Sequence, residues 1–135
     1  PDTADNVNVY VPGTGADLGS VGGGGEWGHG DIGRAEKSVE DAMAVAPGES
    51  TAAIMWLDYD APDNVIPFVD GGAESQASSE SYAQAAASDL SSFTDGLRAT
   101  DQGGGANLTM TGHSYGSTTI GVAARDEGLD VDNMI

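Results

Sequence analysis

Apolar and polar positions alternate at 7–11, the pattern of a β-strand, and the run breaks into a glycine-dense stretch over 12–30. Apolar residues then recur every three or four positions over 31–46, which predicts an amphipathic helix, and Pro47-Gly48 stops it. The next segment, 51–57, is continuously apolar and predicts a strand covered on both faces.

A loop rich in Asp, Pro and Gly over 58–78 leads to a second predicted helix, which the glycines at 103–105 end. Its expected buried face consists of Tyr82, Ala85, Ala86, Leu90, Phe93 and Leu97. A short apolar strand from Asn107 follows, then a helix over 117–127 that Gly128 terminates, and then the start of a further strand at 133–135. Alternating strands and helices predict parallel pairing with right-handed crossovers, and hence a three-layer α/β/α sandwich with a parallel sheet.

The junction between the third strand and its helix reads Gly112-His113-Ser114-Tyr115-Gly116, a G-x-S-x-G pattern. The chain is rich in glycine and serine, so the pattern is informative only because a strand precedes it and a helix follows it. A serine on such a sharp turn strains the backbone, and side chains two residues to either side would collide with neighbouring elements. The pattern predicts that Ser114 is a catalytic nucleophile.

A second segment supports the same chemistry. The first strand opens into Gly13-Thr14-Gly15, and the backbone amides of such a loop can stabilise an oxyanion together with the amide of Tyr115, the residue after the nucleophile. Two other interpretations of these segments exist. Ser114 could simply cap a helix after a glycine turn. Gly13-x-Gly15 could begin a dinucleotide fingerprint, but Leu18 stands where a third Gly or Ala belongs and no helix starts there.

Four segments in order resemble landmarks of an uncharacterised α/β-hydrolase family common in actinobacterial proteins. They are Val9-Tyr10-Val11-Pro12-Gly13-Thr14-Gly15, Trp56-Leu57-Asp58-Tyr59-Asp60-Ala61-Pro62, Asp95-Gly96-Leu97-Arg98-Ala99-Thr100 and Gly112-His113-Ser114-Tyr115-Gly116-Ser117. The resemblance implies a partial α/β-hydrolase fold, with the three strands similar to the third, fourth and fifth of the usual eight. It also implies that Ser114 is the nucleophile and that Gly13 to Gly15 line the oxyanion hole.

The catalytic partners of the serine are not evident. In this fold an Asp or Glu and then a His follow the nucleophile, and no His follows Ser114 here. His113 should point away from Ser114 and have a structural role, whereas His29 lies in the glycine-rich loop and could bend toward it. Asp58 and Asp60 come after the second strand, at the edge where α/β sites form, and could orient a base or contact substrate.

The amino-acid composition limits the kinds of partner that the protein can bind. Twenty-two acidic residues against four basic ones give a formal charge of −18, which disfavours nucleic acid and anionic membranes as partners and indicates adaptation to a saline medium. A secreted or cell-surface protein without a salt requirement could have a similarly acidic composition. There is no cysteine, no run long enough to span a bilayer, and no recognisable metal or cofactor motif.

We therefore expect one α/β-hydrolase core domain over 1–135 that is incomplete at its C-terminus and acts on a small-molecule ester or acyl substrate. The expected acid and His would come from a missing segment, and a second chain or an oligomer would complete the sheet where the third strand is left with an open edge. A chain that begins with Pro1 suggests processing or excision. The alternative is a catalytically incomplete domain with a structural or binding role.

Overall fold

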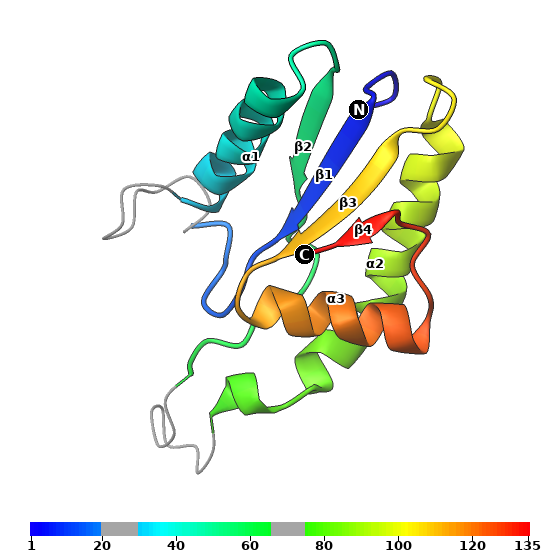
Figure 1. The fold of residues 1–135 in the computed structure, drawn as a ribbon. Helices are drawn as coiled ribbons and strands as arrows, with labels where there is room; N and C mark the ends of the chain where they lie inside the picture. The colour runs from blue at the N-terminus through cyan, green and yellow to red at the C-terminus, as the bar shows by residue number, and fades with distance from the viewer. Residues whose placement is uncertain (20–29, 66–74) are drawn as a thin grey trace.

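The computed structural model describes residues 1–19, 30–65 and 75–135. Four parallel strands form one sheet in the order β2-β1-β3-β4. In chain order the described strands and α-helices are β1 (Asn6–Val11), α1 (Asp31–Val45), β2 (Thr51–Met55), α2 (Ser81–Thr100), β3 (Asn107–Gly112), α3 (Tyr115–Asp126) and β4 (Asn133–Met134), with a 3₁₀ turn at Gln76–Ser78. This is the expected three-layer α/β arrangement (Figure 1).

The period of two along β1 divides the helices between the two faces of the sheet. Val7, Val9 and Val11 point into the main core, where they meet α2 and α3. Asn8 and Tyr10 point the other way and hydrogen-bond to α1, as in the 2.9 Å bond from Asn8 Nδ2 to the Ser38 hydroxyl. The face under α2 and α3 is therefore apolar, and the face under α1 is partly polar.

The helices follow the predicted periodicity with small differences. In α2, Ala86 and Leu90 are buried as expected, but Ala85 is exposed. In α1 only Ala35 is fully buried, and Ile32 remains 42% exposed because this helix lies at the β2 end of the sheet. The last helix begins at Tyr115, two residues before the predicted start.

Two expectations about strand environment were wrong. The segment 51–57 was expected to be covered on both faces, but all five residues of β2 are only half-buried because this strand lies at one end of the sheet order. The strand before Ser114 was expected to have an open edge, yet β3 pairs with β1 on one side and with β4 on the other, where Thr109 aligns with Asn133. The outer strands of the described sheet are β2 and β4.

Candidate active site

Ser114 occupies the turn between β3 and α3. Its φ of 55° and ψ of −121° make it the one non-glycine residue with positive φ in the described part of the chain. Such a conformation is strained for a residue with a side chain, and strain of this kind collects at functional positions. The side chain is exposed. The turn therefore presents the Ser114 hydroxyl to solvent at the carboxyl edge of the sheet.

Glycines are required on both sides of this turn. A Cβ added to Gly112 would lie 2.6 Å from the Cα of Ser117, and one added to Gly116 would lie 2.1 Å from the carbonyl oxygen of Val11. Both neighbours are backbone atoms, which cannot move aside cheaply. The predicted collisions are present, and they explain why both positions are glycine.

The turn after β1 lies against Ser114. A Cβ on Gly13 would be 2.7 Å from the Ser114 Cβ and 3.2 Å from its hydroxyl oxygen. The register of β1 and β3 causes this approach, because Val11 aligns with Gly112 and both strands end at the same edge. The two segments singled out in the sequence are therefore adjacent in space.

Some backbone amides near Ser114 donate a hydrogen bond to an acceptor within the described residues, and others are open, meaning that they have no such acceptor. The Gly116 amide donates to the His113 carbonyl at 2.9 Å, the Ser117 amide to the Ser114 carbonyl at 3.1 Å, and the Gly15 amide to the Pro62 carbonyl at 2.9 Å. Gly15 was expected to line an oxyanion hole, and its amide is engaged elsewhere. Within the residues that the structure describes, the amides of Gly13, Thr14 and Tyr115 have no acceptor.

Thr14 adds an unusual feature. Its Oγ1 is buried and has no hydrogen-bond partner among the described residues. Burying a hydroxyl without a partner costs about 1–3 kcal/mol, so such groups need an explanation. Thr14 follows Gly13, which contacts Ser114, and precedes the anchored Gly15. The Thr14 hydroxyl is therefore a donor without a partner, within the described part of the chain, in the turn that contacts Ser114.

His113 points toward α1. Its Nδ1 lies 3.2 Å from an Arg34 guanidinium nitrogen, and the same nitrogen lies 3.2 Å from the Tyr10 hydroxyl and 3.4 Å from Asp31 Oδ1. Burial raises the pKa of Tyr10, so its phenol stays neutral and bridges Arg34 and Asp31. This cluster ties the start of α1 to the end of β1. The sequence carried no signal for it, because Tyr10 and His113 are distant in the chain from each other and from the Asp31–Arg34 pair.

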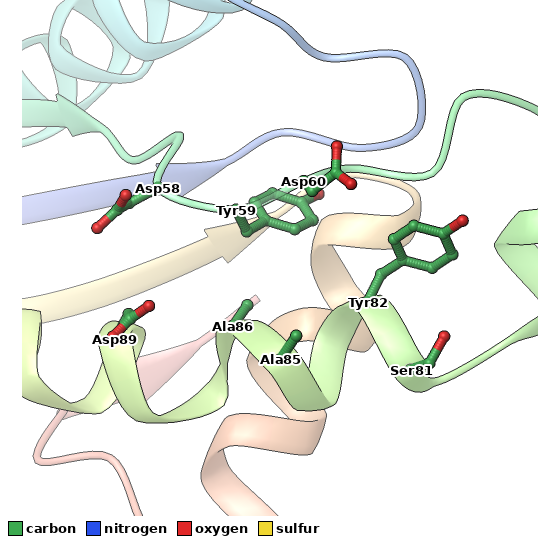
Figure 2. A pocket seen from close by; sticks show the side chains of 8 residues that line it. All are labelled: Asp58, Tyr59, Asp60, Ser81, Tyr82, Ala85, Ala86 and Asp89. Atoms are coloured by element: carbon green, nitrogen blue, oxygen red, sulfur yellow. The ribbon is translucent and has the colours of Figure 1, made fainter.

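The described residues do not supply a general base for Ser114. His113 contacts Arg34, and no hydrogen bond joins it to the Ser114 hydroxyl. His29, the other histidine, lies outside the described residues. Asp58 and Asp60 are exposed and line a cavity beside α2, without a histidine partner in the part of the chain described (Figure 2). The candidate nucleophile and the amides without an acceptor therefore lie close together, whereas no candidate acid or base joins them among the described residues.

The described residues form neither a metal site nor a membrane-spanning helix. Across 1–19, 30–65 and 75–135, no three His, Cys, Asp or Glu side chains converge in a way that could hold a metal ion. Among these residues, no helix combines the length and the apolar character that crossing a bilayer demands.

A parallel α/β sheet with a strained serine at its carboxyl edge is typical of the α/β-hydrolase class. Sequence comparison identifies the family. A profile described as alpha/beta hydrolase matches residues 1–135. The chain belongs to this family. No solved structure matches it.

The relatives found are uncharacterized mycobacterial proteins. Rv2079 of Mycobacterium tuberculosis H37Rv is 36% identical over 135 residues, which is 100% of this chain and 19% of the relative. Mb0988c of Mycobacterium bovis is 32% identical over 87 residues, covering 64% of this chain and 29% of that protein. The chain thus spans less than a third of the length of either relative.

Proposed function

We propose that this chain carries the nucleophile and oxyanion donors of a serine hydrolase that acts on an ester or a similar acyl bond. The observation that supports this most strongly is the contact between two turns: the strained Ser114 lies directly against Gly13. Neither feature is needed merely to connect a strand to a helix.

The chemistry follows from the arrangement. The Ser114 oxygen attacks the carbonyl carbon and loses its proton to a base, while the carbonyl oxygen becomes an oxyanion. The open amide of Tyr115 at the start of α3 and those of Gly13 and Thr14 donate to that oxygen. The positive end of the α3 dipole adds to the same stabilisation. Collapse of the intermediate expels the leaving group and leaves an acyl-serine, which water hydrolyses.

The acid and the histidine of this mechanism come from outside the described residues. We propose that other parts of the full-length protein supply them and that 1–135 is a core domain within a larger hydrolase unit. The described sheet ends at β2 and β4, so a further strand, from the same protein or from a second copy, would join at one of these edges. The open edge that was expected at β3 is already occupied by β4.

A hydrolysis assay on the full-length protein tests the proposal. Ser114→Ala should abolish turnover of p-nitrophenyl butyrate, whereas Ser117→Ala should retain it. Ser117 is a matched control because it is an exposed serine three residues away, whose hydroxyl donates to the Gly112 carbonyl. Equal activity of wild type and Ser114→Ala would overturn the assignment.

A second candidate function is a catalytically incomplete domain with a structural or binding role. The observation in its favour is that no histidine partner of Ser114 exists among the described residues. Absence of turnover in the full-length protein, together with absence of covalent labelling by a fluorophosphonate, would support this candidate over the hydrolase.

We also propose that the surface is adapted to a saline medium. The formal charge of −18 on 135 residues implies strong self-repulsion at low salt. The four basic side chains all form ion pairs, which leaves most carboxylates without a basic partner. Screening by molar salt should therefore stabilise the folded state.

A further inference from the structure

A cavity of about 330 Å³ lies between the segment after β2 and the first turns of α2 (Figure 2). Tyr59 belongs to the first wall, and Tyr82, Ala85 and Ala86 belong to the second. The volume is at the lower end of the range for small-molecule sites, roughly 300–1,000 Å³. The cavity is therefore suited to a small group, not to a long acyl chain.

Two contacts connect this cavity to the Ser114 turn. The Tyr59 hydroxyl donates to the Pro12 carbonyl at 2.6 Å, and Pro12 precedes the glycine that touches Ser114. The Tyr82 ring meets the Tyr115 ring edge-on, with centroids 6.4 Å apart, and Tyr115 follows Ser114. Each wall is thus in contact with one of the two segments that form the candidate active site, which places the cavity where part of a substrate would lie.

The cavity combines aromatic rings with negative charge. Asp58 and Asp60 on one wall and Asp89 on the other contribute three carboxylates beside the two tyrosines. Tyr59 also stacks on Trp56, with ring centroids 5.8 Å apart, which fixes the orientation of its ring. Aromatic side chains and carboxylates that line one cavity together favour an organic cation, through cation–π attraction and through the field of the charges.

Among the described residues, no lysine or arginine forms an ion pair with these carboxylates. The sequence has only four lysines and arginines. Arg34 pairs with Asp31, Lys37 with Asp41, Arg98 with Asp132, and Arg125 with Glu80 and Asp126. The cavity therefore keeps its negative charge, and a positive group on a ligand would supply the missing countercharge.

We propose that this cavity is a substrate subsite that binds an alkylammonium group next to the scissile bond and disfavours a carboxylate there. The proposal rests on the proposed function for its link to catalysis, because Ser114 must attack the bond. The binding part does not depend on catalysis and can be measured separately.

Binding is tested on the full-length Ser114→Ala protein, in which no turnover can interfere. Choline and its neutral isostere 3,3-dimethyl-1-butanol are titrated by calorimetry at fixed ionic strength. We expect choline to bind at least about fivefold more tightly, as attraction by the solvent-exposed carboxylates together with cation–π contact would produce. Equal affinity for the two probes would overturn the proposal.

Variants in the Ser114→Ala background locate the site. Asp60→Asn should weaken choline by roughly threefold or more, whereas Asp95→Asn, which removes an equal charge from an exposed α2 position outside the cavity, should not. Ala85→Trp should abolish binding of both probes, because Ala85 is exposed and its replacement fills the cavity without disturbing the core. Equal losses in Asp60→Asn and Asp95→Asn would show a general surface field and would refute a local site.

Hydrolysis by the wild-type full-length protein links the cavity to catalysis. Acetylthiocholine and 3,3-dimethylbutyl thioacetate are matched in size and differ in charge. We expect kcat/KM to favour the cation by about fivefold, and Asp60→Asn to reduce that preference. Equal turnover of both thioesters would refute the subsite while leaving the hydrolase assignment intact. Choline binding without hydrolysis of either thioester, and without fluorophosphonate labelling of Ser114, would refute the hydrolase assignment alone.

Discussion

Replacing Ser114 by glycine should make the protein more stable than replacing it by alanine. Both variants lose the hydroxyl, but only glycine adopts φ of 55° and ψ of −121° without strain. Strain of this kind costs roughly 1–3 kcal/mol in the alanine variant. The greater conformational freedom of glycine in the unfolded chain reduces the advantage of the glycine variant by about 0.4–1 kcal/mol. The expected advantage of Ser114→Gly is therefore about 1–2 kcal/mol, or roughly 3–8 °C in Tm for a chain of this size.

The assay is urea unfolding followed by circular dichroism at constant salt, with Ser114→Gly and Ser114→Ala measured side by side. The same two replacements at Ser117 are the control, because Ser117 lies in the first turn of α3 with negative φ. There glycine should be less stable than alanine by up to about 1 kcal/mol. If Ser114→Gly proved no more stable than Ser114→Ala, the strained turn on which the site depends would not exist.

Four further outcomes follow from the same structure. Gly13→Ala should suppress labelling of Ser114 by a fluorophosphonate, because its Cβ would approach the Ser114 Cβ to 2.7 Å; unchanged labelling would contradict the contact. Thr14→Val should lower kcat by at least about tenfold while Thr14→Ser restores it, if the buried hydroxyl donates to the oxyanion; equal kcat in both variants would contradict this role. Burial raises the pKa of Tyr59 to about 12, above its ordinary value of 10.0, so the neutral phenol stabilises the fold below pH 10. The free energy of unfolding should therefore fall between pH 10 and 12, and by less in Tyr59→Phe; identical pH profiles would contradict the shift. The Tm should rise between 0.1 M and 1 M KCl, as the Debye length shrinks from about 10 Å to about 3 Å; a constant Tm would contradict salt adaptation.

The parts of the fold that local chemistry determines could be predicted from the sequence. The alternation in β1 and the three-to-four-residue spacing in α2 depend only on the geometry of a strand and a helix, so both elements lie within a few residues of their expected bounds. The turn at Ser114 could be located because a side chain at Gly112 or Gly116 would collide with nearby backbone atoms, so both positions must be glycine.

The features that depend on long-range packing could not be predicted from the sequence. The half-buried state of β2 results from its place at the end of the sheet, and strand order leaves no trace in a five-residue pattern. The cavity joins Asp60 to α2 residues more than twenty positions away, and the engagement of the Gly15 amide depends on Pro62. The sequence indicated which residues are candidates for the functional site. Only the fold shows which of these residues lie close to one another.

The central claim is that Ser114 is an activated nucleophile, and peptide mapping after fluorophosphonate treatment of the full-length protein tests it most directly. We predict a single phosphonyl adduct on the peptide that contains Ser114, absent from Ser114→Ala and retained in Ser117→Ala. An unmodified Ser114 peptide, or an adduct that persists in Ser114→Ala, would contradict the account.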